Sequence, residues 1–402
     1  MNYRVLISTG EVSGDLQGSR LITALRSQAQ RRSLDLEILA LGGDRMAAAG
    51  ATLVGHTTGL GSVGIVEALA YLWPSWQIQQ RAKAIIRHDP PDLVVLIDYM
   101  GPNLSLARFL RRVLPQIPLL YYIAPQEWVW SFGKSRSSAI ADLPDEILAI
   151  FPGEAQYYGD LGAKVRWMGH PLLDTVAQRP DRTTAREQLG IPPEQTTIAL
   201  LPASRTQELK YLLPVMLEAA QHIQAQIPTA HFWVPVSQPA FAAPLQAALD
   251  RCPLAATLWH GDNALLFAAA DLALTKSGTV NLELALQQVP QVVLYRVSAF
   301  TAWIAQHILR FSIPFASPPN LVLNRMVVPE LLQEEATGDR IAQEALDLLQ
   351  NPQRRSQVLA DYQTLRSALG EPGVCDRVAQ VILDSLHPPT IGRGNPPVVA
   401  PA

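Results

Sequence analysis

The sequence has few cysteines, no long apolar run and no excess of basic residues, and each absence excludes a class of protein. Two cysteines, Cys252 and Cys375, are too few for a disulfide framework or a zinc site. No apolar run reaches the ~18 residues of a membrane span, and no basic and apolar leader precedes the first predicted strand. A net charge of −3 gives no general affinity for nucleic acid. We therefore expect a cytoplasmic protein in a reducing compartment.

Two motifs of cofactor and metal chemistry are also missing. The first strand-to-helix turn, between Ser8 and Gly18, lacks the Gly-x-Gly-x-x-Gly spacing of dinucleotide-binding folds, which argues against a dehydrogenase. The sequence contains no Asp-x-Asp motif, so it offers no acidic pair of that kind for a metal ion. We therefore expect a protein with no cofactor and no metal site.

The chain instead alternates apolar strands with helical segments, which is typical of a mostly parallel sheet covered on both faces. The first set of predicted strands is Arg4–Thr9, Leu36–Leu41, Leu93–Asp98, Leu119–Ala124 and Glu146–Phe151. The pattern pauses in a polar stretch after His170 and then restarts. The second set is Thr197–Leu201, His231–Val236, Thr257–His260, Asp271–Thr275 and Gln291–Val297.

These two sets predict an α/β fold with two Rossmann-like domains, at residues 1–170 and 171–340. Ligands of open parallel sheets bind beyond the carboxyl ends of the strands, so we expect the domains to face one another across a cleft. The helices expected at 341–386 would pack back across either domain. Residues 387–402 are rich in proline and predict a disordered tail.

The strand-turn-helix pattern from Asp271 to Leu286 is the most informative stretch. A turn of this kind aims backbone N–H groups of a new helix at a ligand, so Ser277, Gly278 and Thr279 are placed to hold a phosphate. Glu283, about one turn further along, can accept hydrogen bonds from a ribose diol. A phosphate contact followed by a ribose contact indicates a nucleotide-binding site. The alternative is that Ser277 merely caps the helix and Glu283 is a solvated helix residue.

A second turn of the same type follows Leu201. Ser204 and Arg205 lie in this turn, where Arg205 can pair with a diphosphate and Glu208 can orient the arginine. Together with Lys276, Arg205 would stabilise a nucleoside diphosphate leaving group without a metal.

The first domain carries two acidic turns at its predicted strand ends. In the Ser8–Gly18 turn, glycines such as Gly14 allow close approach of a ligand, while Glu11 and Asp15 can bind hydroxyls or bases; the alternative is a capped helix start with incidental acids. Asp98 ends an apolar strand, where partial desolvation would raise its pKa and suit it to be a general base. The competing interpretation is that Asp98 caps a helix starting near Asn103.

Aromatic residues mark the remaining candidate surfaces. Trp128 and Trp130 lie in a loop with Lys134 and Arg136, which suits a sugar or a phosphate, although core packing is the alternative. The apolar segments Leu60–Trp76 and Phe300–Phe315 are core helices by default, but such helices can also lie against a bilayer. A mean hydropathy of +0.10 is high for a soluble enzyme and is compatible with a membrane-facing surface.

Five motifs in order resemble those of lipid-A-disaccharide synthases. Gly10-Glu-Val-Ser-Gly-Asp15 resembles the family signature Gly-Glu-Ala-Ser-Gly-Asp, and Leu201-Pro-Ala-Ser-Arg205 with Glu208 resembles Leu-Pro-Gly-Ser-Arg-x-x-Glu. Ser277-Gly-Thr-Val-Asn-Leu-Glu283 matches Ser-Gly-Thr-x-x-x-Glu. Pro319-Asn320-Leu and Pro329-Glu-Leu-Leu-Gln333-Glu resemble the closing motifs. The resemblance runs from about residue 4 to 385.

The resemblance implies an inverting glycosyltransferase of the type B fold. Such an enzyme joins UDP-2,3-diacylglucosamine to 2,3-diacylglucosamine 1-phosphate, forms the β-1,6-linked disaccharide 1-phosphate of lipid A, and releases UDP. Asp98 would deprotonate the acceptor 6-hydroxyl. The implied acceptor-side residues are Glu11, Ser13, Gly14, Asp15, Asn103, Trp128 and Trp130. The implied UDP-binding residues are Ser204, Arg205, Glu208, Lys276, Ser277, Gly278, Thr279, Glu283 and Asn320.

The acylated substrates imply peripheral contact with the inner face of the inner membrane. The segment expected to make this contact contains Val63, Ile65, Val66, Leu69, Leu72, Trp73 and Trp76, with 302–315 as a second candidate. The chain could also form a homodimer.

The sequence departs from the family beside Asp98. The family has Ala-Pro-Asp-Phe-Asn after this aspartate, whereas Asp98 is followed by Tyr-Met-Gly-Pro-Asn103, and Ser-Pro-Ser-x-Trp-Ala-Trp appears as Ala124-Pro-Gln-Glu-Trp-Val-Trp130. Both changes lie in the acceptor half, so a divergent member with an altered lipid acceptor is plausible. The type B fold also serves the lipid-linked transferase of peptidoglycan synthesis and a UDP-N-acetylglucosamine 2-epimerase. A non-catalytic UDP-dependent lipid-binding module would keep the same nucleotide site.

Overall fold

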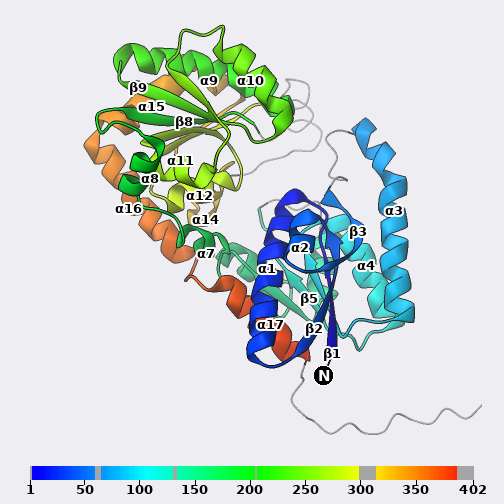
Figure 1. Ribbon diagram of the computed structural model, residues 1–402. Coiled ribbons are helices and arrows are strands. Elements are labelled where there is room, and N and C mark those ends of the chain that lie inside the picture. Colours follow the sequence, from blue (N-terminus) through cyan, green and yellow to red (C-terminus); the bar gives the residue numbers. More distant parts are fainter. Residues whose placement is uncertain (1, 59–64, 130–133, 204–205, 298–313, 387–402) are drawn as a thin grey trace, which may run out of the picture. The chain divides into compact units, whose positions relative to one another are not determined.

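The computed structural model describes residues 2–58, 65–129, 134–203, 206–297 and 314–386. The chain forms two compact units (Figure 1). The first contains the chain up to Pro171 together with the chain from Gly373 onward, and the second contains Leu172–Pro372. Each unit is built around a parallel β-sheet of its own.

The sheet of the first unit has, in the described residues, seven parallel strands in the order β3-β2-β1-β4-β5-β6-β7. All five residues of β4, from Leu93 to Ile97, are buried and apolar, as expected for a strand covered on both faces. The strand order reverses between β1 and β4, where Val5 pairs with Leu93. The strands are β1 (Asn2–Ser8), β2 (Asp35–Gly42), β3 (Thr52–His56), β4 (Leu93–Ile97), β5 (Leu119–Tyr122), β6 (Glu146–Ala149) and β7 (Val165–Trp167).

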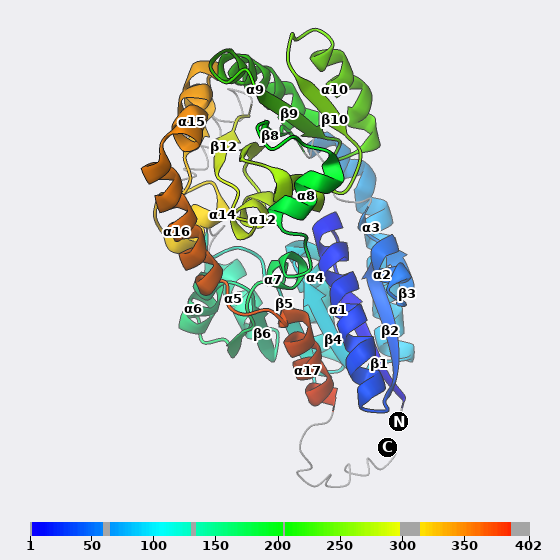
Figure 2. The same ribbon diagram turned by 60° about the vertical axis from the view of Figure 1, so that its left-hand side comes forward.

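The helices of the first unit include one from the far end of the chain. α17 packs against α1, with hydrogen bonds from Gln28 to Asp376 (3.2 Å) and from Arg32 to Asp384 (2.7 Å), and Figure 2 shows the two helices side by side. The helices are α1 (Val12–Arg31), α2 (Asp44–Ala48), α3 (Ile65–His88), α4 (Met100–Val113), α5 (Lys134–Asp142), α6 (Pro152–Asp160) and α17 (Val374–Leu386).

The sheet of the second unit has six parallel strands in the order β10-β9-β8-β11-β12-β13 within the described ranges. Its strand order reverses between β8 and β11, so this unit also has a switch point of the kind at which α/β sheets bind ligands. The strands are β8 (Thr196–Leu201), β9 (Ala230–Pro235), β10 (Ala256–Trp259), β11 (Leu272–Lys276), β12 (Gln291–Tyr295) and β13 (Glu330–Leu332).

The helices of the second unit cover this sheet, and α9 packs against α15 (Figure 2). Of the helices expected after residue 340, α15 and α16 belong to the second unit and α17 to the first. The helices are α7 (Leu172–Val176), α8 (Arg182–Leu189), α9 (Thr206–Gln226), α10 (Ala242–Leu249), α11 (Asn263–Ala269), α12 (Val280–Leu286), α14 (Pro318–Leu323), α15 (Gly338–Gln350) and α16 (Pro352–Ala368).

The predicted α/β fold is confirmed, and each of the ten predicted strands is present with ends that differ by one or two residues at most. Three strands were not predicted, namely β3, β7 and β13. They are short and form the sheet edges, and their residues are mostly half-buried or exposed. Such strands lack the continuous apolar pattern by which a buried strand is recognised.

No helix in the described ranges combines the length and the apolar character that spanning a bilayer requires.

The Asp15 carboxylate holds the start of α2, and its predicted contact with a ligand stays a prediction. Only 4% of Asp15 is exposed. Its oxygens accept hydrogen bonds from the backbone N–H groups of Gly43 (2.8 Å), Met46 (3.1 Å) and Arg45 (3.2 Å). These groups are among the unpaired donors of a helix start, so Asp15 joins α1 to the β2–α2 turn.

Replacing Asp15 with Ala should therefore lower the free energy of unfolding by ~2–4 kcal/mol, because three N–H groups lose their acceptor. Thermal unfolding followed by circular dichroism measures the change. Asp35→Ala, at an exposed position at the start of β2, is the matched control. An Asp15→Ala variant with unchanged stability but impaired substrate binding would support the ligand-binding interpretation.

Candidate active site

Asp98 follows β4 directly, at the switch point of the first sheet. The backbones of Asp98 and Tyr99 are both left-handed, with φ angles of 46° and 50°, so the chain turns sharply before α4 begins at Met100. Tyr99 occupies the cap position of α4. The interpretation in which Asp98 caps a helix that starts near Asn103 is therefore wrong.

The environment of Asp98 makes its carboxyl basic. Burial, with a contribution from Glu11, raises the pKa of Asp98 to about 6, while a hydrogen bond from the Tyr99 backbone opposes this rise. A carboxylate with a pKa close to neutral accepts a proton more readily than an ordinary aspartate. Asp98 thus has the property that a general base requires.

Asn103 fixes the turn that carries Asp98. Its fully buried amide nitrogen donates to the carbonyl oxygens of Asp98 (2.7 Å) and Ile97 (3.1 Å), and its oxygen accepts a hydrogen bond from the Ser8 hydroxyl (2.7 Å). Tyr121 Oη also donates to the Asp98 carbonyl, at 2.8 Å. These contacts involve the Asp98 backbone, so the observed role of Asn103 is to position Asp98.

The glycines of the first turn make room for protein atoms. A Cβ at Gly14 would lie 1.8 Å from the Thr9 hydroxyl, and a Cβ at Gly10 would lie 2.1 Å from the ring of Tyr99. Thr9 thus occupies the space beside Gly14, and close approach of a ligand to this glycine stays a prediction. Glu11 and Ser13 are exposed at the start of α1, so both can contact an acceptor.

A buried carboxylate supports the loop that contains Trp128. Glu154 accepts hydrogen bonds from the backbone N–H groups of Ala124 and Ile150, both at 2.9 Å, and burial raises its pKa to about 7. Trp128 is half-buried, with its ring 5.5 Å from that of Phe151. Packing against Phe151 thus accounts for part of the burial of the Trp128 side chain.

Several predicted positions lie outside the described residues. These are Val63, Trp130, Ser204, Arg205, residues 302–313 of the second membrane candidate, and the tail 387–402. For Ile65, Val66, Leu69 and Leu72 the structure describes only the helical backbone of α3.

The second unit has a cavity of about 260 Å³ beyond the carboxyl ends of β8, β9 and β11. Glu283 lines this cavity, and its carboxylate forms an ion pair with Arg179. The lining residues are Arg179, Leu201, Ala203, Pro235, Ser237, Asp262, Asn263, Ala264, Phe267, Lys276, Val280 and Glu283. Polar groups of both charges on an apolar wall suit a nucleoside.

The turn after β11 is held by its own hydrogen bonds. The N–H of Ser277 donates to Leu294 O (3.0 Å), its hydroxyl donates to Ala316 O (2.6 Å), and the N–H of Gly278 donates to Asn281 Oδ1 (2.8 Å). Thr279 is exposed at the cap position of α12. Of the three predicted phosphate ligands, Thr279 is thus best placed for a direct contact.

Lys276 brings a positive charge to the same turn. Its Nζ donates to Ser277 O at 3.2 Å and lies 3.8 Å from a carboxylate oxygen of Glu208. A Cβ at Gly278 would lie 3.0 Å from this Nζ, so glycine leaves space for the ammonium group.

A buried network connects this turn to β13. Glu330 accepts hydrogen bonds from the N–H groups of Ala316 (2.7 Å) and Ser317 (2.8 Å) and from the amide of Asn320 (2.7 Å). Asn320 is fully buried, and its oxygen accepts from Val327 N at 2.7 Å. A role in holding the start of α14 fits these contacts, and direct contact of Asn320 with UDP stays a prediction.

Three residues were not predicted: Glu154 in the first unit, and Arg179 and Glu330 in the second. Glu330 lies in the Pro329–Glu334 segment, whose resemblance to a closing motif of the family could have indicated that this residue matters. Arg179 lies in the polar stretch between the two strand sets, where sequence alone shows no partner. Glu154 follows Pro152 and Gly153 in an ordinary helix start.

Replacing Glu330 with Gln is expected to weaken UDP binding about tenfold. Ala316 and Ser317 donate to different oxygens of Glu330, so the NH2 of the new amide would face one of these two N–H groups and leave it without an acceptor. A displacement there would release the Ser277 hydroxyl, which donates to Ala316 O. Isothermal titration calorimetry with UDP measures the change, with the exposed Glu334→Gln as matched control. Unchanged UDP affinity in a folded Glu330→Gln variant would show that this network does not shape the pocket.

The family model for lipid-A-disaccharide synthetase matches residues 5–384. The lipid-A-disaccharide synthase of Gloeothece citriformis is 54% identical over 381 residues, which cover 95% of this chain and 99% of that protein.

Two solved structures resemble the fold at low sequence identity. A putative UDP-N-acetylglucosamine 2-epimerase from Listeria monocytogenes has a TM-score of 0.67 at 14% identity, covering 99% of this chain and 100% of that one. MurG from Acinetobacter baumannii has a TM-score of 0.54 at 16% identity, covering 96% and 100%. These likenesses support the type B glycosyltransferase fold, whereas the full-length match identifies the family: the chain belongs to the lipid-A-disaccharide synthases.

Proposed function

We propose that this protein transfers 2,3-diacylglucosamine from its UDP derivative to the 6-hydroxyl of 2,3-diacylglucosamine 1-phosphate. The products are the β-1,6-linked disaccharide 1-phosphate and UDP. The observation that carries the proposal is Asp98, a partly buried carboxyl of raised pKa at the switch point of the first sheet. Family membership supplies the reaction, and the cavity of the second unit supplies a place for the nucleotide.

Asp98 acts as the general base. Its carboxylate takes the proton of the acceptor 6-hydroxyl, and the oxygen attacks C1 of the donor sugar. The bond from C1 to the β-phosphate oxygen breaks, and its electron pair leaves with UDP, so the anomeric centre is inverted. Asn103 and Tyr121 hold the backbone of Asp98, and a fixed base needs no rearrangement at the moment of reaction.

The leaving UDP carries negative charge that the second unit can stabilise. Lys276 supplies a cation, Thr279 lies at the start of α12, and Arg205 is the third predicted contact. These groups would replace a metal ion, so we expect activity in the presence of EDTA. Glu283 would accept hydrogen bonds from the ribose hydroxyls while its ion pair with Arg179 fixes its orientation.

Tyr99 distinguishes the predicted acceptor side of this chain from the family pattern. Its ring lies against Gly10, and its hydroxyl forms a hydrogen bond with Ser75 of α3. The family pattern has alanine after the catalytic aspartate, so this aromatic wall beside Asp98 replaces a small side chain. We propose that Tyr99, together with Glu11 and Ser13, selects the acceptor.

Asp98→Asn should abolish transfer and leave UDP binding intact. Loss of a general base costs about 10²–10⁴-fold in kcat, and asparagine tolerates the left-handed backbone of this position. The assay is acceptor-dependent UDP release in detergent micelles with EDTA. Transfer that persists in the variant would exclude Asp98 as the base. UDP binding without release in the wild type would point to a different lipid acceptor.

The raised pKa predicts opposite effects of pH on activity and on stability. kcat/KM should fall as pH falls below about 6, because Asp98 becomes protonated. The folded state binds this proton more tightly than the unfolded state, so the free energy of unfolding decreases as pH rises from about 4 to about 6. At pH 8, Asp98→Asn should therefore be the more stable protein, by at most ~3 kcal/mol, whereas a lower melting temperature would contradict the assignment.

A pair of exposed tryptophans supports contact with a membrane. Trp73 and Trp76 on α3 are 64% and 52% exposed, and their rings stack with centroids 5.0 Å apart. Lys83 and Arg87 lie further along the same helix, over the ring of Phe109. Indole rings partition into the interface of a bilayer, and cations favour anionic lipids. We propose that the part of α3 that carries Trp73 and Trp76 contacts the inner face of the inner membrane.

Replacing both Trp73 and Trp76 with Ala should weaken partitioning into anionic phospholipid vesicles about tenfold or more. Vesicle co-sedimentation measures the bound fraction. Trp167→Ala is the matched control, because Trp167 of β7 is also exposed, at 45%. Equal partitioning of the double variant and the control would place the membrane contact elsewhere.

A further inference from the structure

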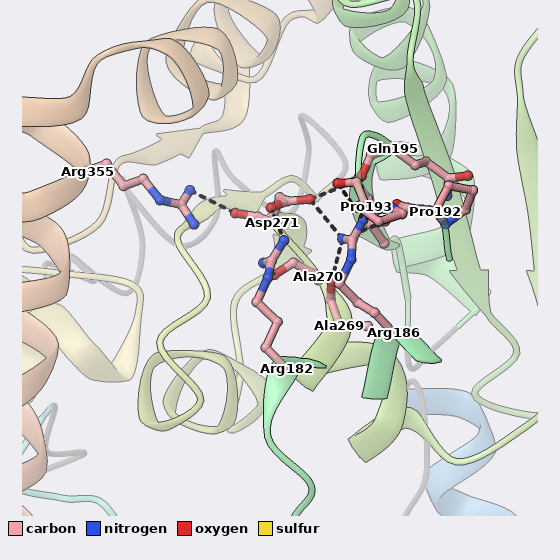
Figure 3. Close-up of polar contacts among 10 residues, drawn as sticks. Arg182, Arg186, Pro192, Pro193, Gln195, Ala269, Ala270, Asp271 and Arg355 are labelled. Atoms are coloured by element: carbon pink, nitrogen blue, oxygen red, sulfur yellow. Dashed lines mark hydrogen bonds and ion pairs between the residues drawn. The ribbon is translucent and has the colours of Figure 1, made fainter. Parts of the chain in front are cut away.

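The second unit contains a group of charged side chains that the proposed reaction does not use. Arg182, Arg186 and Arg355 approach Asp271 from different sides (Figure 3). Asp271 immediately precedes β11, so the group lies at the amino ends of the strands. The predicted UDP contacts lie at the opposite, carboxyl ends.

Arg186 has a structural role within this group. It is buried, and its guanidinium donates to the carbonyl oxygens of Pro192 (2.6 Å), Gln195 (2.8 Å) and Ala269 (3.3 Å) and to the Asp271 carboxylate (3.4 Å). These contacts use its donors to join the segment before β8 to the start of β11. These contacts within the protein explain the burial of the Arg186 guanidinium without a ligand.

Arg182 and Arg355 differ from Arg186, because they line a cavity of about 470 Å³. Arg182 donates to the Asp271 carboxylate (2.5 Å) and to Ala270 O (3.2 Å), and its side chain remains 45% exposed. Arg355 donates to the main-chain oxygen of Asp271 at 3.1 Å. Each guanidinium has five N–H donors in a planar fork, so both retain donors beyond these contacts. The other lining residues are Thr196, Ile227, Asp271 and Leu349.

The charges of this group do not balance. One carboxylate faces three arginines, and its oxygens already accept from Arg182, Arg186 and the N–H of Thr197 (2.9 Å). Burial lowers the pKa of Arg355, and the nearby charge of Arg182 lowers it further, while Asp271 opposes the change. An anion in the cavity would relieve the repulsion between the two guanidiniums.

We propose that the cavity between Arg182 and Arg355 binds the phosphate group of a small phosphorylated molecule, at a site separate from the UDP pocket. The two guanidiniums would hold the phosphate oxygens by charge-assisted hydrogen bonds, as planar forks do in bidentate anion recognition. Arg182 is three residues from Arg179, the partner of Glu283, but its ion pair is with Asp271 at the opposite end of β11.

The test is calorimetric titration of the full chain with inorganic phosphate and with glycerol 3-phosphate, in EDTA, with and without saturating UDP. Binding of either ligand that survives saturation with UDP is the expected result. Tighter binding of glycerol 3-phosphate would identify a phosphate ester as the occupant, and equal binding would identify free phosphate.

Arg182→Gln and Arg355→Gln should each weaken this binding about tenfold, because each removes a charged donor. Arg340→Gln is the matched control, since Arg340 is a half-exposed arginine of the same unit that pairs with Glu344. Melting temperatures identify variants that fail to fold, and Arg355→Lys, which keeps the charge but loses the fork, should bind with intermediate affinity.

Three results would overturn the proposal. The first is phosphate binding that saturating UDP abolishes, which would place the anion in the UDP pocket. The second is binding that is equal in folded Arg182→Gln, Arg355→Gln and Arg340→Gln. The third is absence of binding by the wild-type protein. None of these results depends on transferase activity, so failure of this site is distinguishable from failure of the proposed function.

Discussion

A strand that is buried on both faces of a parallel sheet can present functional groups only at its ends, and this constraint organises both units. β4 consists of five buried apolar residues and is followed at once by Asp98. β11 is followed in the same way by the turn from Ser277 to Thr279. Both strands border a switch point, where the neighbouring crossovers diverge and leave space for a ligand. The proposed base and the proposed nucleotide site therefore occupy equivalent places in two similar sheets.

The turns at the strand ends depend on polar side chains that form hydrogen bonds with backbone groups of the protein. Asn103 holds the left-handed backbone at Asp98, Glu154 holds Ala124, and Glu330 holds Ala316 and Ser317. A buried polar group without a partner is costly, so each of these side chains favours one arrangement of its loop. Asp98 itself opposes folding at neutral pH, because burial disfavours its charged form. The stability of the surrounding core offsets that cost.

The second unit concentrates positive charge at both ends of the same strand. Lys276 lies at the carboxyl end of β11, and Arg182 and Arg355 meet Asp271 at its amino end. The two places are nevertheless different in kind, since Lys276 is in a turn before a helix whereas the arginines come from α8 and α16. The segment from Arg179 to Arg182 contributes to both places.

The sequence by itself determined ten strands of the two sheets, the positions of Asp98 and Glu283 after or near such strands, and the family, because buried strands and glycine-rich turns leave local patterns. The edge strands β3, β7 and β13 lack such a pattern. Only the tertiary structure decided what the neighbouring side chains do. Asp15 and Gly14 belong to a motif typical of the family, yet one caps α2 and the other makes room for Thr9. Arg179, Glu330 and Arg355 acquire their partners from residues 10 to 104 positions away. A sequence pattern records the spacing of neighbours along a helix or strand, whereas hydrogen bonds and ion pairs between distant segments depend on how the chain folds back on itself.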